Sequence, residues 1–256
     1  MAEVSTHALK LAGKISIVIG GASGIGEATT RLFASNGAFV VIADIQDELG
    51  KKVSNSIGLQ HCMYFHCVIS SEDDVISLIN FTIEKYSCLD ITFSNAGIKE
   101  SSHTMYPVTT AACVKHAARA MVNHHVKGSI ICTTSVVASK GASMQTDYVM
   151  SKHAVLGLVR SASKQLGVYG IRVNCVSPSA VVTGISSMSP EEIEKTKKVC
   201  EGLSSLKGAR LSVEDVAEAV VFLASDGSKF VSGHELVVDG GLTKLPDEDD
   251  LKMYNC

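Results

Sequence analysis

The stretch ISIVIGGASGIG, residues 15–26, decides the fold of this chain. Its apolar half, Ile15–Ile19, predicts a buried strand, and its glycine-rich half turns into a predicted helix at 24–36. Glycines in such a turn let the backbone approach a pyrophosphate, and the helix N-terminus offers free N–H groups and a partial positive charge. The turn therefore predicts a dinucleotide site, with an ordinary tight turn as the alternative. The contacts are expected from Gly20, Ser23, Gly24, Ile25 and Gly26.

Apolar runs alternate with amphipathic stretches along the rest of the chain, which predicts a Rossmann-type α/β fold. In this fold a doubly wound parallel sheet of about seven strands has helices on both faces. The helix starting near 213 carries a capping box, Ser212 with Asp215, and Ser189 to Glu192 carries another at a helix start. The predicted strands are 15–19, 39–43, 63–66, 91–94, 129–133, 172–176 and 235–238. The predicted helices are 24–36, 47–57, 71–86, 111–122, 147–166, 190–200 and 213–223.

The chain is predicted to form a single domain over residues 1–256, the Rossmann domain that carries the dinucleotide site, with an acidic C-terminal tail at 246–256. The chain is 46% hydrophobic and contains no linker, repeat or low-complexity block that would divide it. The tail is either solvated or contacts a subunit or the substrate.

Charge and cysteine usage exclude several classes of function. A net charge of −3 gives no basic surface for nucleic acid. No apolar run is long enough to cross a membrane, and the first 14 residues lack a signal peptide, so we expect a cytoplasmic protein. The 8 cysteines lack paired spacing, which predicts buried reduced thiols, and no cluster has metal-ligand spacing.

Asp44 ends the second predicted strand and bears on the choice of cofactor. A carboxylate at this place accepts hydrogen bonds from the adenosine ribose and repels a 2′-phosphate. Its neighbours Ile45 and Gln46 supply no cation, so NAD is expected rather than NADP. Capping of the next helix is the alternative role for this side chain.

Tyr148 and Lys152 are separated by one helical turn and so share a helix face. A nearby ammonium favours the phenolate, which would lower the pKa of Tyr148 toward neutrality and make it a general acid/base. Lys152 can also bond the nicotinamide ribose. Ser135 follows the predicted strand 129–133, where it can hold a substrate oxygen. The three side chains together predict a proton-transfer site on an alcohol or carbonyl.

These motifs, taken in order, resemble the short-chain dehydrogenase/reductase family over nearly the whole chain. The phrases GGASGIGEAT and VVIADIQDELG resemble its branch in plant secondary metabolism. That branch includes secoisolariciresinol and isopiperitenol dehydrogenases, and the nepetalactol-related enzymes are the expected nearest members. The resemblance implies a homo-oligomer, either a tetramer or a dimer. It also implies cofactor contacts at Asn95, Ala96, Gly97, Pro178, Val181 and Thr183, with Thr183 on the nicotinamide carboxamide.

The sequence departs from the family pattern at several places. Val68 stands where an Asp usually contacts adenine, a loss that weakens binding by about tenfold at most. The segment 97–115 is short and lacks the Asn of the usual proton relay, and a helix start beside the site is expected to be missing. His103 and Tyr106 are either pocket residues that partly substitute or exposed loop residues. Ile19, Ser94 and Ser179 also replace the residues usual in the family.

Three functions follow from these observations. The first is an NAD-dependent oxidoreductase acting on a secondary alcohol or hemiacetal of a small apolar plant metabolite, of monoterpenoid or iridoid type. The second is a non-redox cyclase or isomerase of nepetalactol type that keeps NAD as a structural element. The third is a silent binding protein, which the intact catalytic side chains disfavour. The expected apolar pocket comprises Val136, Val137, Val182, Ile185 and Met188, with ordinary core packing as the alternative role of these residues.

Overall fold

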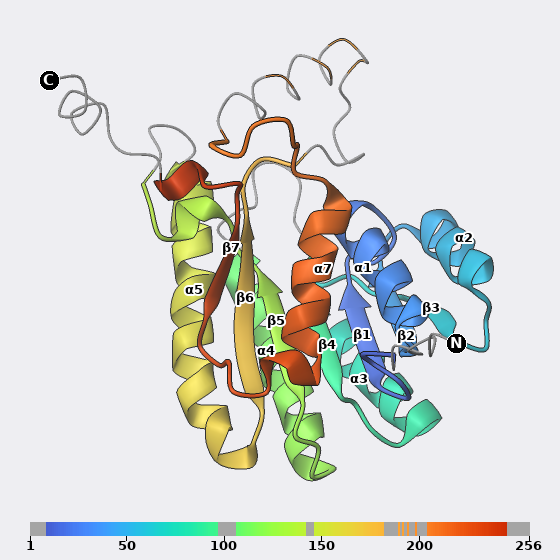
Figure 1. The fold of residues 1–256 in the computed structure, drawn as a ribbon. Helices are drawn as coiled ribbons and strands as arrows, with labels where there is room; N and C mark the ends of the chain where they lie inside the picture. Colours follow the sequence, from blue (N-terminus) through green and yellow to red (C-terminus); the bar gives the residue numbers. More distant parts are fainter. Residues whose placement is uncertain are drawn as a thin grey trace, which may run out of the picture.

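The computed structural model describes residues 9–96, 106–141, 146–181, 189, 191, 194, 198 and 204–244. Within them, seven parallel strands form one sheet in the order β3-β2-β1-β4-β5-β6-β7 (Figure 1). The doubly wound parallel sheet predicted from the sequence is therefore confirmed. The strands are β1 (Ile15–Ile19), β2 (Phe39–Asp44), β3 (Cys62–His66), β4 (Ile91–Ser94), β5 (Ser129–Thr133), β6 (Arg172–Pro178) and β7 (Glu235–Val238).

Helices cover both faces of the sheet, and each face has its own apolar core (Figure 1). One core joins the sheet to α3, α4 and α5, and the other joins it to α1, α2 and α7. Most of the predicted helix 190–200 lies outside the described residues. The described helices are α1 (Gly24–Ser35), α2 (Asp47–Ile57), α3 (Glu72–Tyr86), α4 (Tyr106–Asn123), α5 (Thr146–Leu166) and α7 (Val213–Ala224).

The central strands are buried along their whole length because helices cover both of their faces. Every residue of β1, β4 and β5 is buried, as the apolar runs of a parallel sheet require. Five of the predicted buried thiols are confirmed, and Cys88 is half-buried. The buried ones are Cys62, Cys67, Cys113, Cys132 and Cys175.

The start of α7 agrees with the sequence-based prediction, and the start of α4 differs from it. Ser212 and Asp215 form the predicted capping box of α7, with both hydrogen bonds present, whereas the second predicted box, at 189–192, lies largely outside the described residues. Helix α4 begins at Tyr106 rather than at residue 111. The first turn of α4 carries no acidic residue, and residues 97–105 lie outside the described residues, so the missing helix start in this segment stays a prediction.

The topology determines where a ligand can bind. Strand β1 pairs with β2 on one side and with β4 on the other, so the strand order reverses between β1 and β4. Ligands of such sheets bind at this reversal, at the carboxyl ends of the strands. No helix within the described ranges is long and apolar enough to cross a membrane.

Candidate active site

The glycine-rich turn lies against the end of β4. Gly20 has φ +76°, and a Cβ there would come 2.7 Å from the Cα of Ala96. A Cβ on Gly26 would clash with the carbonyl oxygen of Gly20. Ser23 precedes α1 without its side chain capping the helix, which leaves the first-turn N–H groups for an anion. The turn is therefore shaped for close backbone approach to a phosphate group.

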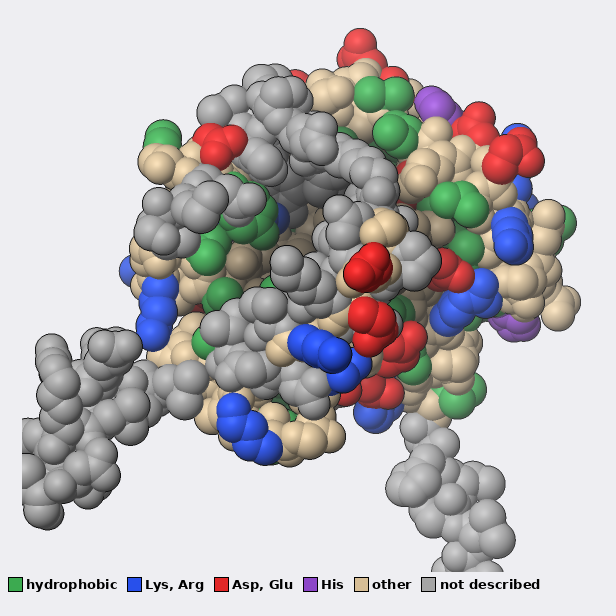
Figure 2. All heavy atoms as spheres, turned by 90° about the horizontal axis from the view of Figure 1, so that it is seen from above, with side chains coloured by type: hydrophobic (Ala, Val, Ile, Leu, Met, Phe, Trp, Pro, Cys, Tyr) green, Lys and Arg blue, Asp and Glu red, His purple; other side chains and the backbone are tan. Residues whose placement is uncertain are grey.

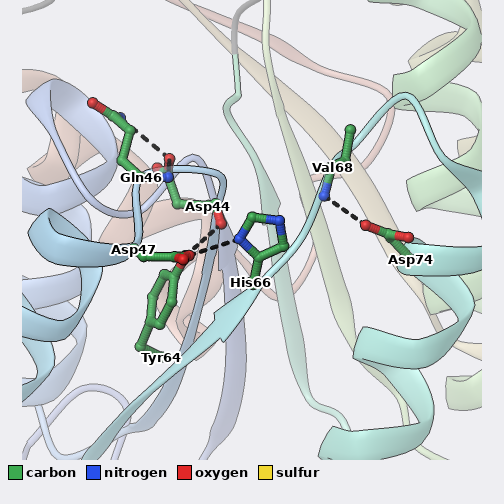
Figure 3. A network of polar contacts seen from close by, with 7 residues as sticks. All are labelled: Asp44, Gln46, Asp47, Tyr64, His66, Val68 and Asp74. Carbon is green, nitrogen blue, oxygen red and sulfur yellow. Dashed lines mark hydrogen bonds and ion pairs between the residues drawn. The ribbon is translucent and has the colours of Figure 1, made fainter.

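Asp44 ties the end of β2 to this turn. Its buried carboxylate accepts hydrogen bonds from the Ala22 N–H at 3.0 Å and from the Gln46 N–H at 3.1 Å. The Gln46 side chain adds a third, at 3.2 Å (Figure 3). Gln46 is the N-cap residue that precedes α2, so its hydrogen bonds to Asp44 come from outside the helix and do not establish the capping alternative. Ile45 next to it is 60% exposed, so its side chain is open to a ligand.

The ends of β4, β5 and α5 are linked through Thr133. Its hydroxyl donates to Asn95 Oδ1 at 3.0 Å, and its carbonyl oxygen accepts from Lys152 Nζ at 3.3 Å. The Asn95 amide in turn donates to the Gly20 carbonyl oxygen at 3.4 Å. Thr133 was not among the predicted site residues, and only its place at a strand end could have suggested it.

Ser135, Tyr148 and Lys152 come together at the carboxyl end of β5. Ser135 lies two residues beyond the end of β5 and is 8% exposed. Tyr148 and Lys152 lie in the first turns of α5, with Lys152 Nζ 5.5 Å from the centroid of the Tyr148 ring. The structure thus brings the three predicted catalytic side chains into one site, while their roles remain predictions.

Burial controls the proton affinities of this group. It raises the pKa of Tyr148, and the Ser135 hydrogen bond only partly opposes this. Burial also lowers the pKa of Lys152 to about 7. The expectation that the Lys152 ammonium would lower the pKa of Tyr148 is therefore wrong for the chain alone, because burial is the largest cause of the shift and disfavours the charged phenolate.

The other predicted cofactor contacts lie only partly within the described residues. Val68 is 38% exposed at the place of the expected adenine contact, and its N–H donates to Asp74 at 2.9 Å (Figure 3). Its side chain offers adenine no acceptor. Pro178 ends β6 and Val181 is half-buried just beyond it. Gly97, Thr183, His103 and the Tyr106 side chain lie outside the described residues.

An apolar surface adjoins Ser135, Tyr148 and Lys152, the predicted proton-transfer group. Val136 and Val137 are half-buried in a short 3₁₀ turn after Ser135. Seen from the carboxyl ends of the strands, hydrophobic side chains border a hollow in this face of the molecule (Figure 2). The other predicted pocket residues, Val182, Ile185 and Met188, lie outside the described residues. Among the residues that are described, no group of three or more His, Cys, Asp or Glu side chains is placed to hold a metal ion.

Comparison with known proteins agrees with this geometry. A family model described as enoyl-(acyl carrier protein) reductase matches residues 20–243. A short-chain dehydrogenase reductase of Arabidopsis thaliana is 46% identical over 91% of this chain and 83% of its own. The chain therefore belongs to the short-chain dehydrogenase/reductase family, whose members typically use a nicotinamide cofactor.

Two further relatives come from plant terpenoid metabolism. A (+)-cis,trans-nepetalactol synthase of Nepeta racemosa is 50% identical over 92% of this chain and 96% of its own. The (−)-isopiperitenol/(−)-carveol dehydrogenase of Mentha piperita, named as mitochondrial, is 48% identical over 93% of this chain and 96% of its own. The predicted resemblance to this plant branch is confirmed, and the relatives include both a dehydrogenase and synthases.

Replacing Gly26 by Ala is expected to weaken nucleotide binding by at least about tenfold, since the new Cβ meets the Gly20 carbonyl oxygen and displaces the turn. Titration of NADH fluorescence measures the loss. The matched control is Gly157→Ala, where a Cβ meets nothing within 4 Å, and it should bind as the wild type does. Equal affinity in Gly26→Ala and wild type would contradict the assignment of the turn.

The buried Lys152 predicts how stability depends on pH. Its pKa is about 7 in the folded chain and near 10.5 when unfolded, so the unfolded state binds more protons between these values. Stability from this group therefore rises with pH across that window. Urea unfolding should show that the free energy of unfolding of the wild type, relative to that of Lys152→Met, is larger at pH 9 than at pH 6. The exposed-lysine control Lys164→Met should run parallel to the wild type, and a parallel Lys152→Met curve would refute the prediction.

Proposed function

We propose that this protein is an NAD-dependent oxidoreductase that transfers hydride between NAD and a secondary alcohol or hemiacetal of a small apolar monoterpenoid. The observation that carries the proposal is the meeting of Ser135, Tyr148 and Lys152 beside the glycine-rich turn. The 48% identity to a monoterpenol dehydrogenase supports the substrate class.

The residues divide the chemistry between them. Ser135 holds the substrate oxygen, and Tyr148 takes the hydroxyl proton in oxidation or returns it in reduction. The nicotinamide ring supplies the acceptor or donor of the hydride that leaves or joins the carbinol carbon. Lys152, anchored on the Thr133 carbonyl oxygen, is positioned to hold the nicotinamide ribose. Val136 and Val137 offer the apolar surface that suits a terpenoid ring.

The choice of NAD rests on Asp44. Its carboxylate is buried at the end of β2 beside the glycine-rich turn, where a 2′-phosphate would meet a fixed negative charge. The next two residues, Ile45 and Gln46, supply no cation to neutralise that charge. These features support NAD over NADP.

A non-redox cyclase or isomerase is the second candidate. The observation that favours it is the raised pKa of Tyr148, since a buried neutral phenol can donate a hydrogen bond to an enol or aldehyde oxygen without any hydride transfer. The 50% identity to a nepetalactol synthase points the same way. In this case NAD would be a structural part of the site.

The two candidates are separated by one assay with NAD⁺. Wild type is expected to form NADH from a cyclic monoterpenoid alcohol such as carveol or nepetalactol, and Tyr148→Phe to lose this activity by about a hundredfold or more. Oxidation should rise toward alkaline pH, because burial raises the pKa of the phenol that must lose its proton. NADH fluorescence and product stereochemistry are followed together.

A second arm offers the dialdehyde-derived enol that precedes nepetalactol. A changed ring-isomer ratio without any NADH would reject hydride transfer as the main activity and establish the cyclase. If neither substrate distinguishes wild type from Tyr148→Phe, both candidates fail and a binding protein remains.

We further propose a homo-oligomer, with the α4 and α5 surfaces in contact between copies. A groove of about 410 Å³ between these helices is lined by apolar side chains such as Val114, Ala118 and Leu158. Light scattering should give a multiple of the 27.0 kDa chain mass, and Leu158→Arg should lower it. A monomeric wild type would contradict this assembly. The cytoplasmic location stays a prediction, since the Mentha piperita relative is named as mitochondrial.

A further inference from the structure

Tyr64 occupies an unusual place between β3 and α2. Its ring packs against Gly50 near the start of α2, where an added Cβ would overlap two ring carbons. A Gly within a helix lowers helix stability by about 1 kcal/mol relative to Ala. At this position the missing side chain leaves the space that the Tyr64 ring occupies. The room lets the long side chain run along α2 toward the carboxyl end of the sheet (Figure 3).

The Tyr64 hydroxyl reaches two acceptors at that end. It lies 2.7 Å from the Asp44 carbonyl oxygen and 2.6 Å from Asp47 Oδ1, so its one proton is shared between the last residue of β2 and the first of α2. His66, two residues along β3, contacts the same Asp47 oxygen through Nδ1 at 2.6 Å. These contacts attach the β2–α2 loop, residues 44–47, to strand β3.

The charge of Asp47 suits this role. Hydrogen bonds from Tyr64 and His66 lower the pKa of its carboxyl group, so it stays an ionised acceptor. The carboxylate is half-exposed, yet both of its partners are fixed on a strand of the sheet. A carboxylate held by two strand residues restricts the loop more than a solvated one does.

The held loop is the one that carries Asp44. While the Asp44 carbonyl oxygen accepts from Tyr64 and from the Cys67 N–H at 3.1 Å, its carboxylate accepts from the Ala22 N–H of the glycine-rich turn. Movement of the loop would therefore move both the carboxylate and the turn. Since the Val68 side chain offers adenine no acceptor, a larger share of the affinity for adenosine falls to this loop.

We propose that Tyr64 and Asp47 are positioning residues for the adenosine half of the dinucleotide, with Gly50 providing the space that the Tyr64 ring needs. The pair acts through Asp44 and does not touch the reacting atoms. The inference rests on the proposed NAD site and extends it to residues outside the glycine-rich turn and the proton-transfer group.

The test compares Tyr64→Phe with wild type in calorimetric binding of NAD⁺ and of AMP. Loss of the hydroxyl keeps the ring, and it should weaken both ligands by about two- to tenfold. Binding of nicotinamide mononucleotide, followed by saturation-transfer NMR, should not change. The matched control is Tyr86→Phe, because Tyr86 packs on Phe39 at the opposite end of β2 with ring centroids 5.9 Å apart, and it should bind all three ligands as wild type does.

A double-mutant cycle tests whether the two residues form one unit. Tyr64→Phe combined with Asp47→Ala should lose little more affinity than either single variant, since each already breaks the shared contact. Gly50→Ala should reproduce the loss by displacing the ring, although Ala is the better helix former.

Other outcomes separate the inference from the proposed function. Unchanged NAD⁺ and AMP affinity in Tyr64→Phe, additive losses in the double variant, or equal weakening of nicotinamide mononucleotide would overturn the positioning role alone. A wild-type protein that binds neither NAD⁺ nor AMP would overturn the proposed function, and the inference with it.

Discussion

The close approach of Gly20 to Ala96 is the constraint on which the site depends. It brings the turn after β1 onto the end of β4, where the strand order reverses. Asp44 then reaches the turn from β2, and Asn95 reaches it from β4. Three strand ends thus meet at one short segment of backbone. A side chain at Gly20 would separate them, and a positive φ of +76° independently disfavours any other residue.

From that junction a chain of contacts runs to the proton-transfer group. Thr133 joins Asn95 to Lys152 through its hydroxyl and its carbonyl oxygen. The lysine therefore has its position before any ligand arrives, at the cost of burying an ammonium group. That cost appears in the pKa of Lys152, which burial lowers to about 7. Preorganised groups of this kind are what a site needs to act on developing charge without first rearranging.

The fold was predictable because its signals are local, and the details of the site were less so because they depend on packing between distant segments. Apolar runs bounded by turns located all seven strands, and Asp44 was placed by its position at a strand end. The start of α4 at Tyr106, five residues before the predicted start at 111, was missed, since tertiary packing overrides local propensity at helix ends. The direction of the Tyr148 pKa was also missed, because burial is a property of the assembled core. Thr133 and Tyr64 carry no motif at all.

The raised pKa of Tyr148 also bears on the direction of the chemistry. At neutral pH a phenol with a raised pKa keeps its proton, so it is ready to donate to a carbonyl or enol oxygen and must first be ionised to oxidise an alcohol. Reduction and cyclisation both begin with that donation. Reduction also needs a hydride donor against the reacting carbon, whereas cyclisation does not. The same Ser135 and Tyr148 can therefore serve either of the two proposed activities. Both would hold the dinucleotide at the Asp44 loop and the Gly20 turn, so the distinction between them rests on the position of the substrate carbon relative to the nicotinamide.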